Sequence, residues 1–175
     1  MNSSSMKKFL FISMALLLAC VAWAQNDSND IVKVGDSMPA FTIVHDNGTQ
    51  VASSSFKGKV ILVNLFATWC PPCQKELAAV KGQLWPKYKD NKDFVMLVIG
   101  REHTDADLKK YNEKKGFSFP LYPDKNRAIF NAFAKNLIPR SYLIGKDGKV
   151  IYTSKGYTDQ EFAELMNQIE GALKK

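Results

Sequence analysis

Two cysteines, Cys70 and Cys73, enclose two prolines in the stretch Trp-Cys-Pro-Pro-Cys at 69–73. A pair at this spacing can help to bind a metal ion, form a structural disulfide or react as a dithiol. A structural zinc ion needs about four ligands, and the two histidines of the chain, His45 and His103, each stand alone, so we expect no metal. A disulfide that closes so short a loop restrains the unfolded chain very little. The pattern therefore favours a pair of thiols that reacts.

Residues 1–24 have the pattern of a secretory signal peptide. Two lysines at 7 and 8 precede an uncharged apolar run, which ends in an A-x-A cleavage site at 22–24. The run is short for a membrane span. Two other interpretations stay open: an uncleaved anchor, or cleavage before Cys20, because Leu17–Cys20 resembles a bacterial lipobox. We predict cleavage after Ala24 and export to the periplasm or cell envelope, with membrane attachment only if Cys20 carries a lipid.

The rest of the chain is long enough for one domain with its own core. We predict a linker over 25–34 and a single domain over 35–175. Loss of the signal peptide lowers the formal net charge from +7 to +5. The remaining positive residues are scattered singly or in pairs, which is typical of solvated faces, so we expect no nucleic-acid partner.

Hydrophobic periodicity and turn residues predict how the chain is organised. The predicted segments are a hairpin over 41–52, a buried strand over 60–67, a helix over 71–88, a strand over 93–100, a helix over 104–116, a strand or loop over 117–124, a helix over 124–136, a hairpin over 139–154 and a helix over 158–175. Strands that alternate with helices indicate an α/β fold with at least one parallel pair, to which the last hairpin adds antiparallel strands. Helix caps are predicted at Thr104, Asp124 and Thr158, and a helix stop at Gly116.

The cysteines follow a buried strand and open a helix, which is the context of a thioredoxin-like redox motif. The segments 54–77, "SSFKGKVILVNLFATWCPPCQKEL", and 139–151, "PRSYLIGKDGKVI", resemble the exported bacterial thiol–disulfide oxidoreductases of the TlpA/ResA type. The resemblance covers most of 35–173. It implies a thioredoxin-like fold, in which a central mixed sheet is flanked by helices, with an added N-terminal β-hairpin and an inserted αβ element.

The resemblance also implies a function. The chain would use its dithiol to reduce or exchange disulfides in envelope proteins. Its partners would be protein disulfides or dithiols and a membrane-bound or soluble electron donor, and cytochrome c maturation is one role of the family. No cofactor is expected beyond a redox-active Cys70–Cys73 disulfide.

The chemistry assigns different roles to the two thiols. Cys70 is expected to attack a partner disulfide from the positive end of the helix, and Cys73, one turn further in, to resolve the mixed disulfide. Pro71 and Pro72 lack N–H donors, so only the Cys73 N–H is left near the Cys70 sulfur. We therefore expect Cys70 to be less acidic than in a strong oxidant, and the pair to favour the reducing direction.

Residues outside the cysteine segment are expected to complete the site. Pro139 matches the cis-proline of the family, and a cis bond would turn the Ile138 backbone towards the cysteines, where it can pair with an extended substrate strand. Trp69 would form an apolar platform beside the sulfurs, or serve only as a partly buried core aromatic.

The sequence departs from thioredoxin proper at two positions. Asn64 stands where thioredoxin has a buried aspartate, so the proton relay for Cys73 must lie elsewhere, and Glu102 is the candidate. The alternative for Glu102 is a surface acid paired with Arg101. Ala78 replaces the usual helix proline, which predicts a straighter helix.

Two other functions stay open. A thiol peroxidase of the peroxiredoxin type could use Arg101 to polarise a peroxide, but the threonine that it needs three residues before the reactive cysteine is Ala67 here, and Thr68 comes one residue late. A binding domain without enzymatic activity is the third possibility.

Overall fold

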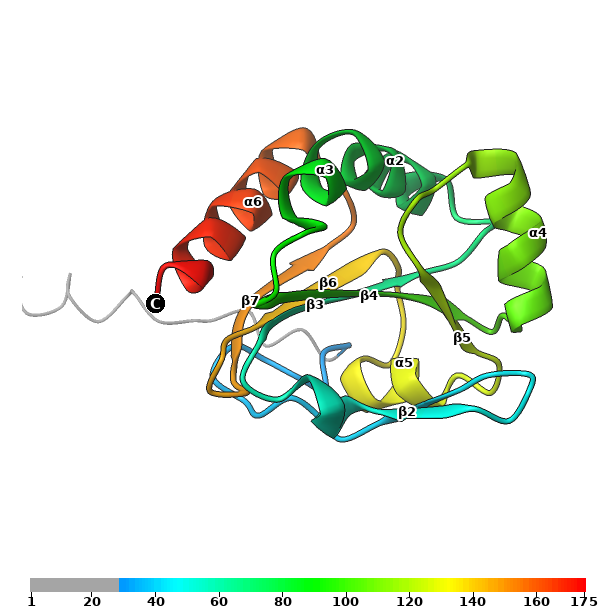
Figure 1. Ribbon diagram of the computed structural model, residues 1–175, viewed down its shortest axis with the longest axis horizontal. Helices are drawn as coiled ribbons and strands as arrows, with labels where there is room; N and C mark the ends of the chain where they lie inside the picture. The colour runs from blue at the N-terminus through cyan, green and yellow to red at the C-terminus, as the bar shows by residue number, and fades with distance from the viewer. Residues whose placement is uncertain (1–28) are drawn as a thin grey trace, which may run out of the picture.

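The computed structural model describes residues 29–175 (Figure 1). The predicted signal peptide, its cleavage site and Cys20 lie outside the described residues. Within 29–175, no helix is long and apolar enough to cross a membrane.

A mixed five-stranded sheet forms the centre of the molecule, in the order β5-β4-β3-β6-β7. Its strands are β3 (Val60–Phe66), β4 (Phe94–Arg101), β5 (Leu121–Asp124), β6 (Arg140–Ile144) and β7 (Val150–Lys155). The pairs β3–β4 and β4–β5 are parallel, whereas β3–β6 and β6–β7 are antiparallel. Every residue of β3 is buried, as expected for a nearly continuous apolar strand in the middle of a sheet. The predicted α/β fold is confirmed.

Helices cover both faces of the sheet (Figure 1). One face carries α2 (Pro71–Ala79), α3 (Trp85–Tyr88) and α6 (Asp159–Leu173); the other carries α5 (Ala128–Phe133), the short turn η1 (Ser53–Phe56) and the added hairpin of β1 (Thr42–Val44) and β2 (Gln50–Ala52). The inserted element comprises α4 (Asp105–Lys115) and β5. Side chains alternate along β3, so Leu62 and Phe66 join the core under α2, while Ile61 and Val63 join the core on the α5 side. Asn64 shares the face of Leu62 and therefore points towards α2.

The predicted helix caps are present. The side chains of Thr104 and Thr158 each accept a hydrogen bond at 3.1 Å from the backbone N–H three residues later. Gly116 ends α4 with a positive φ of 59°, a conformation that glycine adopts without steric cost. The Asp124 carboxylate accepts two N–H groups of α5 at 3.0 and 2.8 Å. The helix itself begins later than predicted, at Ala128, because Asp124 still belongs to β5.

The helix predicted over 71–88 is interrupted by a widened π turn at Val80–Leu84. Pro86 follows in α3. A proline inside a helix removes one N–H donor and its ring collides with the carbonyl four residues earlier, and a widened turn relieves that conflict. The predicted helical run to residue 88 is confirmed, and α2 passes through Ala78 without a break; the π turn within the run was not predicted.

Part of the segment predicted as a linker packs against the domain. The N–H groups of Ile31 and Val32 donate to the Phe133 carbonyl at 3.2 and 3.1 Å, and Asp30 forms a bridge with Ala134. Val32 is buried in the core on the α5 side. The packed structure therefore begins before residue 35.

Candidate active site

The two cysteines lie at the junction between β3 and α2. Cys70 is the N-cap residue of α2, and its sulfur accepts the Cys73 N–H at 3.3 Å. The two sulfurs form a disulfide, with the Cα atoms 5.3 Å apart. Cys70 retains 4% of its surface in contact with solvent and Cys73 none. The outer sulfur is therefore the one that a partner thiol or disulfide can reach.

The prolines have the effect that their chemistry predicts. Pro71 and Pro72 are the first two residues of α2, and neither has an N–H. The cap bond to the Cys70 sulfur therefore comes from Cys73, the third residue of the helix. A sulfur at a helix N-terminus usually gains from several amide dipoles, and here two of those amides are missing.

The bond between Ile138 and Pro139 is cis, as predicted. The Ile138 carbonyl oxygen lies 3.9 Å from Cys70 Sγ. A disulfide sulfur carries no proton, so this is a van der Waals approach in the oxidised state, while a Cys70 thiol could donate to the same oxygen. The negative end of the carbonyl dipole faces the sulfur, which disfavours a thiolate at Cys70 relative to a thiol.

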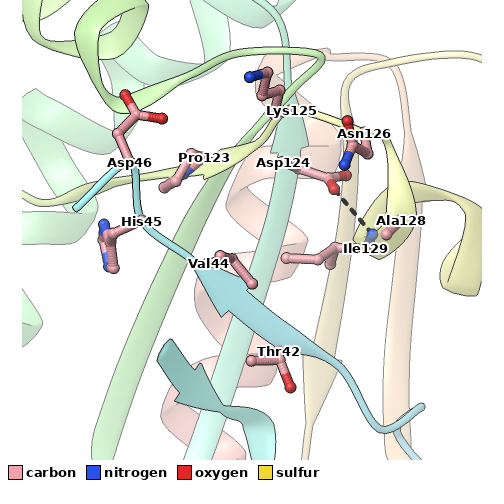
Figure 2. Close-up of a pocket in the computed structure, with 10 residues that line it drawn as sticks. All are labelled: Thr42, Val44, His45, Asp46, Pro123, Asp124, Lys125, Asn126, Ala128 and Ile129. Carbon is pink, nitrogen blue, oxygen red and sulfur yellow. Dashed lines mark hydrogen bonds between the residues drawn. The ribbon is translucent and has the colours of Figure 1, made fainter. Parts of the chain in front are cut away.

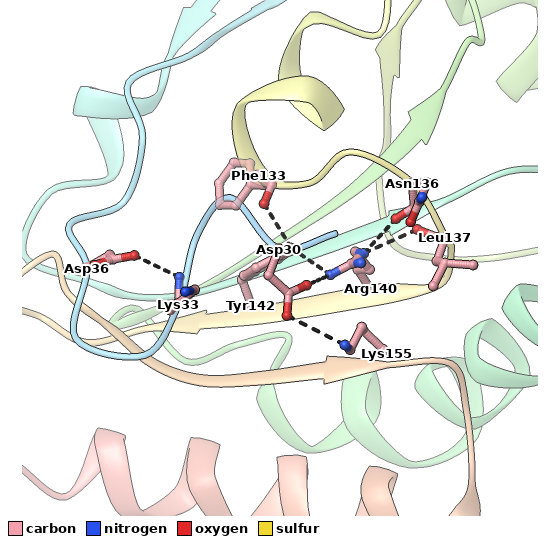
Figure 3. A network of polar contacts seen from close by, with 9 residues as sticks. All are labelled: Asp30, Lys33, Asp36, Phe133, Asn136, Leu137, Arg140, Tyr142 and Lys155. Carbon is pink, nitrogen blue, oxygen red and sulfur yellow. Dashed lines mark hydrogen bonds and ion pairs between the residues drawn. The ribbon is translucent and has the colours of Figure 1, made fainter. Parts of the chain in front are cut away.

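Arg140 braces the segment that precedes the cis-proline (Figure 3). Its guanidinium is 2% exposed and pairs with the carboxylate of Asp30. Its Nε–H is shared between the carbonyl oxygens of Asn136, at 3.0 Å, and Leu137, at 3.3 Å. This residue was not predicted from the sequence, where its one signal is a charge at the start of a buried strand.

Two apolar residues next to the active-site segments are exposed. Trp69 is 59% exposed and Leu137 is 56% exposed. The guanidinium of Arg101 lies 5.2 Å from the Trp69 ring and 5.1 Å from the Phe130 ring, within the range of cation–π attraction. The exposed indole is therefore held from one side by a partly buried arginine.

A buried acid lies on the same face of α2 as Cys73, three residues further on. Glu76 is 3% exposed, and its Oε1 accepts the Ser141 hydroxyl at 3.0 Å. The Ser141 oxygen in turn accepts the Asn64 amide N–H at 3.0 Å. Glu76 Oε2 has no hydrogen-bond partner among the described residues. Burial raises the pKa of Glu76 to about 7, so this carboxyl group can gain or lose a proton near neutral pH.

Glu102 was the predicted proton relay for Cys73, and Glu76 was not predicted. Glu102 is 48% exposed on the side chain and lies 3.1 Å from Arg101 Nε, which is the surface pairing that stayed open as the alternative. A signal for Glu76 was present, since Cys73, Leu77 and Val80 recur at the spacing of a buried helix face. Residue 76 belongs to that stripe.

A cavity on the α5 side of the sheet contains no cysteine in its lining. It measures about 310 Å³ and lies between β1 and the connection that follows β5 (Figure 2). Its polar lining includes His45, Asp46, Asp124 and Lys125. It includes neither cysteine, and its acid Asp124 already caps α5. The thiol chemistry is therefore not located there.

These features define a thiol–disulfide oxidoreductase: a thioredoxin-like sheet, a disulfide at the N-terminus of α2 and a cis-proline beside the Cys70 sulfur. The sequence model of the redoxin family matches residues 33–169. This chain belongs to the redoxin family.

Individual relatives agree with this assignment. The ResA thiol–disulfide oxidoreductase of Bacillus thuringiensis strain Al Hakam is 33% identical over 144 residues, which is 82% of this chain and 79% of that protein. The ResA protein of Bacillus subtilis strain 168 is 27% identical over 94% of this chain and 95% of its own length.

Solved structures show the same fold. The solution structure of a Bacteroides thetaiotaomicron protein is 35% identical, with a TM-score of 0.78 over 84% of this chain and 94% of that one. A thiol:disulfide interchange protein of the thioredoxin family from Chlorobium tepidum TLS is 26% identical, with a TM-score of 0.65 over 81% of this chain and 98% of that one.

Proposed function

We propose that the chain is an exported reductase of disulfides in envelope proteins. The observation that carries this proposal is the Cys70 sulfur, which keeps the small solvent contact that Cys73 lacks, lies 3.9 Å from the Ile138 carbonyl oxygen and accepts only the Cys73 N–H, because Pro71 and Pro72 have none. The signal-like pattern of 1–24 supports location in the periplasm or cell envelope, with membrane attachment only through a lipid on Cys20.

The reaction has two exchange steps. The Cys70 thiolate attacks a client disulfide, forms a mixed disulfide and releases one client sulfur as a thiolate, which takes up a proton. Cys73 then loses its proton and attacks the Cys70 sulfur, which releases the second client thiolate and forms the Cys70–Cys73 disulfide. The client gains two electrons and two protons. An envelope electron donor, membrane-bound or soluble, must return the pair to the dithiol, and no other cofactor takes part.

Glu76 replaces Glu102 as the proposed proton acceptor for Cys73. It lies one helical turn from Cys73, it is buried, and its pKa of about 7 suits proton transfer at neutral pH. Glu76 also lines a cavity of about 10 Å³ beside Tyr157 and Thr158, about the space that one water molecule needs. That cavity offers the proton an exit from the carboxyl group.

Substrate trapping tests the proposal. The chain without its predicted signal peptide, once reduced, should reduce insulin disulfides. A Cys73→Ala variant should accumulate mixed disulfides through Cys70, and a Cys70→Ala variant should accumulate none. To test a role in cytochrome c maturation, the substrate is a peptide with a Cys-x-x-Cys-His haem-binding motif whose two cysteines form a disulfide. Reduction of this peptide by the reduced chain would support that role. The proposal fails if neither insulin nor cystine peptides are turned over in any redox buffer.

The thiol peroxidase gains no support from the structure. Arg101 contacts two aromatic rings and Glu102, whereas the peroxidase interpretation places it on a peroxide. Peroxide consumption by a reduced Cys73→Ser variant remains the direct test that separates the two activities.

A further inference from the structure

The turn that delivers Cys70 is held by side chains from two other elements. Residues 67–70 form a turn closed by the Cys70 N–H, which donates to the Ala67 carbonyl at 3.2 Å. Thr68 lies inside that turn. Its N–H donates to His103 Nε2 at 3.0 Å, and its carbonyl oxygen accepts the Gln74 side-chain N–H at 3.0 Å. One peptide unit on each side of Thr68 is therefore fixed by a side chain.

Both holding side chains are themselves fixed. Gln74 belongs to α2, and its Oε1 accepts a hydrogen bond from Lys115 of α4 at 2.9 Å. His103 is 8% exposed and lies in the connection from β4 to α4. Its backbone N–H donates to the Gly100 carbonyl at 3.2 Å. A Cβ atom at Gly100 would lie 2.7 Å from Leu108 Cδ2 and 3.1 Å from His103 Cδ2. The glycine thus leaves room for both side chains.

The hydrogen bond sets the protonation state of the imidazole. Nε2 accepts a proton from Thr68, so it carries none of its own, and a neutral ring then holds its proton on Nδ1. Protonation would place an N–H on Nε2, directly opposite the Thr68 N–H, and the bond would be lost. Burial lowers the pKa of His103, which keeps the ring neutral at neutral pH.

The charged and titratable groups around His103 come from two elements. The end of β4 and the residue after it supply Arg101 and Glu102; α4 supplies Asp107, Lys110, Tyr111 and Lys114, of which all four line the same cavity as Thr68 and His103. The carboxylates of Asp107 and Glu102 raise the pKa of His103, and Arg101 lowers it, but burial has the largest effect. Because burial outweighs the two carboxylates, the pKa of His103 lies below its ordinary value of 6.5, and the ring becomes protonated only in acid.

We propose that His103 is a positioning residue for the thiol–disulfide exchange: it accepts the Thr68 N–H, which fixes the turn that presents Cys70, and its protonation releases that turn. The proposal rests on the proposed function, because the turn matters only if Cys70 reacts. The atom and electron balance of the exchange is unchanged, because His103 takes no part in the transfer.

The chain offers a matched set of variants. A glutamine at 103 can place an amide oxygen close to the position of Nε2, so His103→Gln keeps an acceptor that does not titrate. His103→Leu removes the acceptor. His45→Gln removes the other histidine of the chain, which pairs with Asp105 at 3.0 Å instead of the active-site turn, and serves as the control.

The first measurement is the amide signal of Thr68 in the ¹⁵N-labelled, oxidised protein between pH 8 and pH 4.5. In this state the cysteines do not titrate. We expect the Thr68 amide to shift with the same midpoint as the His103 ring protons, below the ordinary value of 6.5, in the wild type and in His45→Gln. We expect no shift with that midpoint in His103→Gln. A Thr68 amide that does not follow the His103 titration in the wild type overturns the proposal, even if no variant folds.

The second measurement is the rate of insulin reduction by the pre-reduced protein. We expect the ratio of the wild-type rate to the His103→Gln rate to fall by about threefold or more from pH 8 to pH 4.5, as the imidazole becomes protonated. His103→Leu should be slower than His103→Gln at pH 8. A flat ratio, or equal rates for the two variants, contradicts the proposal. If the wild type reduces no insulin, the proposed function fails, and the Thr68 titration still decides whether the turn is controlled by His103.

Discussion

The Glu76 carboxylate and the Ser141 hydroxyl are joined by a 3.0 Å hydrogen bond across the interface between α2 and β6. Ser141 is paired with Asn64 in the register of β6 with β3, and their side chains also bond. The three polar residues form one buried chain under the helix that carries the cysteines. This chain leads to two predictions about Glu76.

The first prediction concerns the resolving step. In Glu76→Gln, Cys73 loses its proton acceptor, so we expect the mixed disulfide to decay about a hundredfold more slowly at pH 7, the lower end of general-base effects. The measurement is the decay of a Cys70-linked client peptide, followed by mass spectrometry after acid quench. Glu113→Gln, at an exposed position of α4, is the control. Equal decay in both variants and the wild type would remove Glu76 from the mechanism.

The second prediction concerns stability and pH. The pKa of Glu76 is raised from 4.5 to about 7 in the folded state, so its contribution to stability is complete below pH 4.5 and is lost as the pH rises through 7. The free energy of unfolding of the wild type, relative to Glu76→Gln, should therefore fall by roughly 3 kcal/mol between pH 4.5 and pH 8. Urea unfolding of the oxidised proteins measures this difference. A difference that is constant over that range would show that burial does not raise the pKa of the Glu76 carboxyl group.

The third prediction concerns the acidity of Cys70. The side chain of an N-cap residue accepts from the second or third helical N–H, and the second position here is Pro72. Pro72→Ala restores that donor, and we expect the Cys70 pKa to fall by roughly half to one unit. Pro71→Ala restores an N–H only at the first position, which a cap does not use, and is the matched control. The pH dependence of iodoacetamide alkylation, in a Cys73→Ser background, gives both values. Identical pKa values in the two variants would rule out the missing-donor explanation.

The fourth prediction concerns client binding. Trp69 is exposed beside Cys70 and its ring is held by Arg101. We expect Trp69→Ala to raise KM for protein disulfides by about tenfold, because a large exposed aromatic is a typical anchor of an interface. The reaction of Cys70 with a small cystine compound should change much less. Val34→Ala, at another exposed apolar position, should leave KM for proteins unaltered. If the reactions with small and with protein disulfides were slowed equally, the substitution would have changed the reactivity of Cys70 and not the binding of the client.

The sequence by itself determined the elements, the fold and the reacting pair. The nearly continuous apolar run of β3, the turn residues of both hairpins and the caps of α4 and α6 depend on neighbouring residues, so they can be recognised in the sequence. The Cys-Pro-Pro-Cys spacing after a buried strand predicted the reacting pair in the same way, and the Pro139 segment was predicted from its resemblance to the family. The π turn before Pro86 was missed although its cause is also local, because the helical pattern of the apolar residues continues through it.

Only the tertiary structure decided which polar residues surround the sulfurs. Glu76 lies on the buried stripe of its helix, but a stripe of apolar residues does not show that a charged side chain among them is itself buried, and only the fold shows that Glu76 is 3% exposed while Glu102 is half exposed. His103 reaches Thr68 across 35 positions of sequence, and Arg140 reaches Asp30 across 110. Desolvation and hydrogen bonding at such distances depend on how α2, α4 and β6 pack around β3, and packing is a property of the assembled fold.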